Sequence, residues 1–227
     1  MVLDLLDNKD GRYTNSPMTS KFLVKGKSGY VDDHALHHTN TWASCGRLDE
    51  VIKEGEALLP YVTGWVDPAT YWNDYMIGQH NRATSGQAHY LVQNLDISDR
   101  RKLTDLVGGA ASYSIALCKA NHELKAVVVD QKEPLDISEP LVEGCNFQNR
   151  ITLLAGDFFE THLGSGYDVC LISGGVVPIK PKEESRQLFR FAYDILEPGE
   201  SVVIQDYMCI EDHPERRRLD TMEDLYV

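Results

Sequence analysis

The chain has 227 residues, of which 42% are hydrophobic and 25% are charged, and its formal net charge is −13. This length allows a buried core in one domain with an appendage, and the negative charge argues against nucleic acid or an anionic membrane surface as partners. No apolar run is long enough for a transmembrane helix, and the first residues lack the pattern of a signal peptide. The five cysteines are scattered without a CxxC pair, so we predict a cytoplasmic protein with reduced thiols.

The N-terminal stretch predicts the end of a helix followed by a β-hairpin. Val2–Asp7 has the pattern of a helix end, Asp10-Gly11 provides turn chemistry, and Pro17 is expected to end the second strand. A helix end followed by a hairpin is typical of the tail of a winged-helix unit. Its recognition helix would precede residue 1, and the charge is unsuitable, so DNA binding is disfavoured.

The stretch Ser28–Leu58 predicts helix and carries a group of histidines. His34 and His38 are four residues apart, so they would share a helix face and could bind a metal ion. A third ligand is not evident. We therefore favour solvated or hydrogen-bonded histidines and expect no metal.

Pro68 is expected to begin a long helix, because proline is favoured in the first helical turn. Trp72, Tyr75, Met76 and His80 follow at three- and four-residue spacing and form one aromatic and thioether face. This face is suited either to core packing or to a wall for a flat aromatic substrate, and the pattern leaves both open. The polar stretch NLDISDRRK then marks a domain boundary, which predicts a helical segment at 1–95 and a ligand-binding domain at 96–227.

The stretch from Leu103 to Asp130 predicts a β-α-β unit with parallel strands. Apolar runs at Leu103–Val107 and Lys125–Asp130 flank a glycine turn and a helix at Ser112–Ala120. Gly108 and Gly109 would let the backbone approach a ligand, and Asp130 would accept hydrogen bonds from ribose hydroxyls. The turn VGGAAS lacks the glycine spacing of a dinucleotide site, which favours a ligand without phosphate, such as S-adenosylmethionine (SAM). The alternative is that the glycines only form a turn.

Alternating helices and strands continue to the end of the chain. We expect helices at Pro134–Gly144 and Lys182–Leu196, a turn at Pro198-Gly199, and strands at Arg150–Ala155, Tyr167–Ile172 and Ser201–Gln205. This order predicts an α/β fold with a doubly wound, mostly parallel sheet. Its ligand crevice would lie at the carboxyl ends of the strands, where these residues fall: Gly108, Asp130, Asp157, Ser173 and Asp206.

Several stretches in order resemble the SAM-dependent small-molecule O-methyltransferases, in particular the bacterial relatives of caffeate and hydroxyindole O-methyltransferases. GRYTNSPMTSKFLVKG resembles the dimerisation domain, LTDLVGGAASYSIAL the SAM motif, and VVVDQKEPL the ribose-binding strand end. NRITLLAGDFFE resembles the adenine-contacting strand, and YDVCLISGGV and LEPGESVVIQDYM resemble the fourth and fifth strands. The similarity covers nearly the whole chain. It implies a Rossmann-like class I methyltransferase sheet, preceded by a mostly helical, winged-helix-derived dimerisation segment.

The resemblance also implies roles for individual residues. Asp105 would anchor the turn, Gly108 and Gly109 would pass under the methionine end of SAM, and Asp130 would bind the ribose. The remaining implied contacts are Asp157 and Phe158 beside the adenine, Ser173 near the sulfonium, and Trp72 and Met76 on the substrate side. The product would be S-adenosylhomocysteine, and the protein would be a homodimer.

The sequence departs from the family pattern in three places. Val107 and Ala111 stand where the SAM turn of the family has glycines. No histidine follows the fourth strand, where Val177 or Pro178 stands. The chain is also shorter than family members at both ends. Asp206 is retained at the end of the fifth strand, and His80 is a candidate substitute base. We predict methyl transfer to a hydroxyl of a small, aromatic molecule. The alternative is a catalytically impaired or non-catalytic homologue that binds SAM, S-adenosylhomocysteine or a partner; a nucleotide-dependent oxidoreductase is disfavoured by the glycine spacing.

Overall fold

The computed structural model describes residues 3–27, 29–174 and 182–206. Its centre is a five-stranded sheet in the order β5-β4-β3-β6-β7, in which every neighbouring pair is parallel. The predicted doubly wound α/β fold is therefore confirmed. The strands are β3 (Lys102–Leu106), β4 (Lys125–Asp130), β5 (Ile151–Ala155), β6 (Tyr167–Ser173) and β7 (Leu196–Gln205), and the helices between them are α7 (Ser112–Ala120), α8 (Lys132–Gly144) and α10 (Lys182–Ile195).

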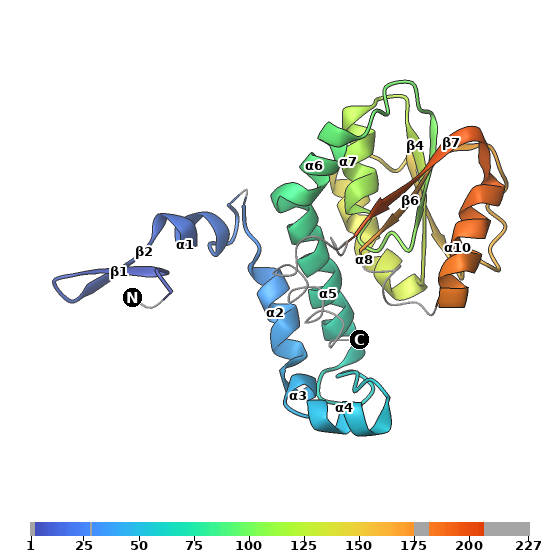
Figure 1. Ribbon diagram of the computed structural model, residues 1–227. Helices are drawn as coiled ribbons and strands as arrows, with labels where there is room; N and C mark the ends of the chain where they lie inside the picture. Colours follow the sequence, from blue (N-terminus) through green and yellow to red (C-terminus); the bar gives the residue numbers. More distant parts are fainter. Residues whose placement is uncertain (1–2, 28, 175–181, 207–227) are drawn as a thin grey trace, which may run out of the picture.

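Side chains of the central strands alternate between two apolar cores, one on each face of the sheet. On β6, Val169 and Leu171 face the core formed with α7 and α8, whereas Cys170 and Ile172 face the core formed with α10. Figure 1 shows α7 and α8 on one side of the sheet and α10 on the other. Burial of each large apolar side chain contributes about 1.5–3 kcal/mol, so the two cores fix the strands that carry the site.

β7 differs from the prediction because the expected turn at Pro198-Gly199 lies within the strand. Tyr167 pairs with Leu196, but Val169 pairs with Ser201, so the register shifts between these pairs. The extra residues are accommodated as an irregularity of the strand, in which Gly199 has a φ of 89°.

A second layer of helices precedes the sheet. It consists of α2 (Asp32–Asn40), α3 (Trp42–Cys45), α4 (Leu48–Glu54), α5 (Pro68–Arg82), a π-helical turn η1 (Ala83–Gln87) and α6 (Ala88–Asn94). Pro68 begins α5 as predicted, and the side chain of Asp67 caps the helix by accepting a hydrogen bond of 2.9 Å from the Thr70 N–H. Figure 1 shows α2 beside α5, and α6 leading towards α7.

Close packing between α2 and α5 fixes the position of α5. A Cβ on Gly78 would lie 2.9 Å from the Cα of His34, so only glycine allows this approach of the two backbones. The side chain of Asn81 donates a hydrogen bond of 2.6 Å to Asp33, and that of Asn40 donates one of 2.8 Å to Asp74.

The histidines of α2 lie partly within this helix layer. The Nε2 atoms of His34 and His38 are 3.1 Å apart, so one ring donates a hydrogen bond to the other. Burial is the main reason why the pKa values of His34 and His37 are lowered to about 4, which leaves both rings neutral near pH 7. The part of the chain that the structure describes contains no group of three metal-ligating side chains.

The N-terminal residues form the predicted hairpin, with β1 (Leu6–Lys9) paired to β2 (Arg12–Asn15) around Asp10-Gly11. Both turn residues have positive φ, at 54° and 77°, as a two-residue hairpin turn requires. The helix end predicted over Val2–Asp7 is wrong, because pairing with β2 draws its last two residues into β1. Pro17 begins helix α1 (Pro17–Phe22) rather than ending a strand.

The hairpin and α1 project from the rest of the chain (Figure 1). The winged-helix origin of this segment stays a prediction. Among the described residues, no helix is both long and apolar enough to cross a membrane.

Candidate active site at the carboxyl edge of the sheet

The turn between β3 and α7 has an unusual backbone for its sequence. Val107, Gly109 and Ala111 have φ values of 58°, 50° and 55°, which lie in the left-handed region. Residues other than glycine cost about 1–2 kcal/mol each in this region. Val107 and Ala111 thus adopt glycine-like conformations at the two turn positions where the resemblance leads one to expect glycine. Such strain persists only where surrounding contacts enforce the conformation.

A side chain at each of the two glycines of the turn would meet different neighbours. A Cβ on Gly108 would lie 2.6 Å from Cγ1 of Val128 and 2.7 Å from Cγ of Asp105, so no side chain fits there. A Cβ on Gly109 would lie 3.4 Å from Sδ of Met76, which belongs to α5. Helix α5 therefore approaches the turn directly.

Asp130, at the end of β4, binds the turn through its carboxylate. Oδ2 accepts a hydrogen bond of 2.8 Å from the Gly109 N–H, and Oδ1 accepts one of 2.7 Å from the Gln131 N–H. Burial raises the pKa of Asp130, while the two N–H donors oppose this rise. Each carboxylate oxygen keeps a further lone pair with which it can accept a ligand hydroxyl.

Asp105 is fully buried beneath the turn. Its Oδ2 accepts a hydrogen bond of 2.7 Å from the Ser114 hydroxyl, and its Oδ1 has no hydrogen-bond partner among the described residues. Burial raises the pKa of Asp105 to about 7, and the charge of Asp130 adds to the rise. Asp105, which was predicted to anchor the turn, is therefore a carboxyl group whose surroundings disfavour its charged form.

The loop after β5 brings Asp157 and Phe158 to the same edge. The Gly156 N–H donates a hydrogen bond of 2.9 Å to the carbonyl of Asp130, which joins this loop to the end of β4. Asp157 Oδ1 accepts a hydrogen bond of 2.8 Å from the Phe159 N–H. The ring of Phe158 is buried in the core on the α10 face and contacts Phe191 at a centroid distance of 5.9 Å.

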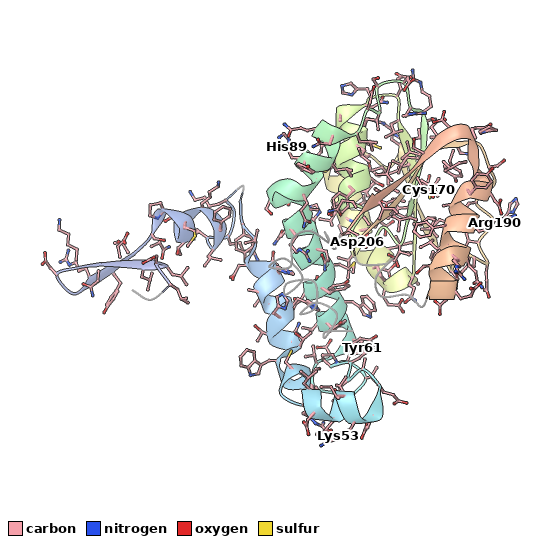
Figure 2. The ribbon with its side chains drawn as sticks, in the orientation of Figure 1. Lys53, Tyr61, His89, Cys170, Arg190 and Asp206 are labelled. Atoms are coloured by element: carbon pink, nitrogen blue, oxygen red, sulfur yellow. The ribbon has the colours of Figure 1, made fainter. Side chains whose placement is uncertain are left out.

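Ser173 and Asp206 follow from the ends of β6 and β7. Ser173 is buried and pairs with Gln205, and the Gly174 N–H donates a hydrogen bond of 3.1 Å to the carbonyl of Gln205. Figure 2 shows Asp206 at the carboxyl end of β7. The structure thus brings the predicted polar residues to one edge of a parallel sheet. Val177 and Pro178, at the position expected for a base, lie outside the described residues.

The side chains predicted to share one face of α5 lie in two different environments. Trp72 lies in an aromatic cluster, with its ring centroid 5.9 Å from that of Tyr61 and 5.7 Å from that of Tyr71. Met76 reaches the turn, and Nδ1 of His80 is 2.9 Å from the hydroxyl of Ser112 at the start of α7. Burial lowers the pKa of His80, with a further contribution from Lys119.

Sequence reasoning missed three polar side chains that hold this region. The Ser138 hydroxyl, on α8, donates to the carbonyl of Gly109; Ser112 contacts His80; and Gln87 Oε1 accepts a hydrogen bond of 3.0 Å from the Tyr113 hydroxyl. Each contact joins residues that are more than 20 positions apart, so no local motif announces it. Burial of Ser138 within the apolar face of α8 is the one available signal.

The chain is similar to known small-molecule methyltransferases. It is 27% identical over 225 residues to 3-hydroxy-5-methyl-1-naphthoate 3-O-methyltransferase of Streptomyces sahachiroi, covering 93% of this chain and 62% of that protein. It is 26% identical over 220 residues to the N,N-dimethyltransferase OxyT of Streptomyces rimosus, covering 92% and 62% of the two chains. No protein-family model matches the sequence.

A solved structure of human N-acetylserotonin methyltransferase in complex with SAM superposes with a TM-score of 0.82 at 20% identity, covering 99% of this chain and 67% of that one. The class I methyltransferase fold predicted from the sequence is thereby confirmed. In sequence the chain is thus similar to an O-methyltransferase and an N,N-dimethyltransferase, and in fold to a methyltransferase solved with SAM. It spans about 62% of the length of the two curated relatives.

Replacing Asp105 with Asn is expected to change how stability depends on pH. The pKa of Asp105 is about 7 in the folded state and ordinarily 3.8, so the folded chain holds a proton between pH 4 and 7 that the unfolded chain has lost. The free energy of unfolding of the wild type should therefore fall, relative to that of Asp105→Asn, as the pH rises through this window. Chemical denaturation of both proteins at a series of pH values measures the difference, in which the histidine contributions cancel. Parallel stability curves would contradict the pKa assignment.

Proposed function

We propose that this chain binds SAM at the carboxyl edge of its sheet and takes part in methyl transfer to a small-molecule hydroxyl. The observation that carries the proposal is the arrangement of Asp130 around the glycine turn. Its carboxylate is positioned by the Gly109 and Gln131 N–H groups and keeps acceptor capacity towards the edge. Two ribose hydroxyls are a natural pair of donors for such a carboxylate.

The residues of this edge suit a cofactor that carries a nucleoside but no phosphate. Gly108 and Gly109 would lie beneath the methionine end, Asp157 beside the adenine, and Ser173 near the sulfonium. The ring of Phe158 packs in the core on the α10 face, so its place beside the adenine stays a prediction. When bound, SAM supplies an electrophilic methyl group, so the protein mainly has to position the acceptor atom against it. The structure of human N-acetylserotonin methyltransferase was solved in complex with SAM, which supports the same cofactor here.

The acceptor side of the site would be formed by α5. Met76 reaches the turn, and Trp72 belongs to the aromatic cluster four residues earlier on the same helix. A thioether and aromatic rings provide a wall for a flat apolar molecule. One relative is named for methylation of a naphthoate hydroxyl, which supports an aromatic acceptor for this chain.

Replacing Asp130 with Ala is expected to weaken binding of S-adenosylhomocysteine. The change removes a charge-assisted hydrogen bond, worth about 1.5–3 kcal/mol, or about tenfold to a hundredfold in affinity. Calorimetric titration measures the effect, and Asp136→Ala, at an exposed position of α8, is the matched control. Equal affinity of wild type and Asp130→Ala would disprove the role of Asp130, and absence of wild-type binding at millimolar ligand would disprove the site.

Removal of the proton from the acceptor is the step for which the sequence provides the fewest candidate residues. The stretch GGVVPIKPKEE after β6 contains no histidine, and Nδ1 of His80 contacts Ser112. Asp206 can orient a proton acceptor, but carboxylates are generally weak bases towards a phenol. The retained cofactor residues favour an active enzyme, whereas the missing histidine favours the impaired homologue.

Methyl transfer to a simple phenol is therefore expected to be slow at pH 7 and to accelerate as the pH approaches the acceptor pKa of about 10. The pH–rate profile of the wild type with a panel of phenols measures this. Val177→His, at a position outside the described residues, should raise the neutral rate. A wild-type rate that is fast and independent of pH near neutrality would show that another residue removes the proton. Binding of S-adenosylhomocysteine without any transfer would support the non-catalytic alternative.

The segment 1–95 is proposed to mediate homodimerisation, and 96–227 to bind the cofactor. Large apolar side chains are exposed along the first segment, including Tyr13 at 60%, Trp42 at 79% and Ile52 at 69%. Surfaces of this kind commonly mark protein interfaces. The N-terminal hairpin projects from the body, where it could reach a second copy (Figure 1).

Sedimentation analysis of the wild type is expected to give a dimer, because association would bury these exposed side chains. Trp42→Glu should shift the equilibrium towards monomer, since a charge would then enter the interface. Tyr193→Glu, at an equally exposed position of α10 outside the segment, is the control and should leave the dimer intact. A wild type that remains monomeric at high concentration would contradict the proposal.

A further inference from the structure

The strained turn between β3 and α7 needs contacts that hold it in place. Its left-handed Ala111 is completely buried and immediately precedes α7, and no side chain caps the N-terminus of this helix. A non-glycine residue in this conformation is retained only when neighbouring groups restrict it. Asp130 holds the turn at Gly109, so other groups have to hold the end of the turn that leads into α7.

Helix α5 and the π-helical turn that follows it contact this end of the turn at successive positions. Sδ of Met76 lies 3.4 Å from the point where a Cβ on Gly109 would stand, and Nδ1 of His80 is 2.9 Å from the hydroxyl of Ser112. Gln87 accepts a hydrogen bond of 3.0 Å from the Tyr113 hydroxyl. The first two residues are one helical turn apart on the same face. Among these contacts, that of His80 is directed at the residue next to Ala111.

The state of the His80 ring suits a structural hydrogen bond. Its side chain is partly buried, and burial lowers its pKa, so the neutral ring persists near pH 7. A neutral imidazole nitrogen can accept the hydroxyl proton of Ser112 or donate to its oxygen, according to the tautomer. Either arrangement connects α5 to the first residue of α7.

We propose that His80 is a positioning residue, which holds the cofactor turn through Ser112 rather than removing a proton from the acceptor. The contact restrains the start of α7 and therefore the left-handed Ala111 before it. Because Met76 touches Gly109 from the same face of α5, the helix that would face the acceptor also supports the turn that would face the cofactor. The effect on ligand affinity rests on the proposed function, whereas the effect on the turn itself does not.

The experiment compares His80→Ala, Ser112→Ala, the double variant and His80→Asn. The amide of Asn places a hydrogen-bonding atom on Cγ, where histidine has Nδ1, but it cannot act as a base. His89→Ala, at an exposed position of α6 (Figure 2), is the matched control. Hydrogen exchange of the Gly109 and Ala111 amides reports on the turn without any ligand, and the Leu171 amide in the central strand is the reference for global unfolding. Calorimetry with S-adenosylhomocysteine reports on the site.

His80→Ala and Ser112→Ala are expected to accelerate exchange of the two turn amides by about threefold to tenfold relative to Leu171, and to weaken the ligand by a similar factor. The double variant should match the single ones, because both remove the same contact. His80→Asn and His89→Ala should stay close to the wild type.

Unchanged exchange of the turn amides in His80→Ala would overturn the proposal, and so would His80→Asn behaving like His80→Ala. If the wild type does not bind S-adenosylhomocysteine, the proposed function fails, while the exchange measurements still decide the role of His80.

Discussion

The hydrogen bond from the Gly109 N–H to the Asp130 carboxylate joins the ends of two neighbouring parallel strands, and the site depends on it. The turn leaves β3 and the carboxylate terminates β4, so the bond fixes the turn relative to the sheet. The carbonyl of Asp130 accepts a further hydrogen bond from Gly156, which begins the loop after β5. One residue therefore organises three strand ends, and its side-chain position follows from backbone donors rather than from mobile side chains.

Two turn residues that are not glycine still adopt glycine-like backbone conformations. Val107 and Ala111 occupy left-handed conformations that cost about 1–2 kcal/mol each. This cost is small beside the favourable burial of two apolar cores, but it is a real fraction of a typical net stability of about 5–15 kcal/mol. The geometry of the turn is thus maintained by packing rather than by the conformational freedom of glycine. Contacts around the turn are important because its non-glycine residues do not favour this conformation by themselves.

Local patterns predicted the α/β part of the chain well. The bounds of Ser112–Ala120 and Lys125–Asp130 agree with the structure, since apolar runs and glycine breaks determine them within a few residues. The N-terminal helix end failed because its residues pair with a strand across the hairpin, and pairing overrides a short apolar pattern. The contact between His80 and Ser112 spans 32 positions and arises only from the packing of α5, so no local signal predicts it.

The charges of the sheet edge argue for the class of ligand more strongly than the glycine spacing does. Asp105, Asp130, Asp157 and Asp206 lie beneath or at this edge, and the neighbouring charge of Asp130 contributes to the raised pKa of Asp105. A pyrophosphate would add further negative charge to this group, whereas a sulfonium and an ammonium would reduce the repulsion among the carboxylates. Helix α7 begins after the left-handed Ala111 and has no side-chain cap. The turn before it lacks the glycine spacing that brings a phosphate to a helix N-terminus. The acidic edge and the incomplete phosphate motif therefore both favour the proposed cationic nucleoside ligand over a dinucleotide.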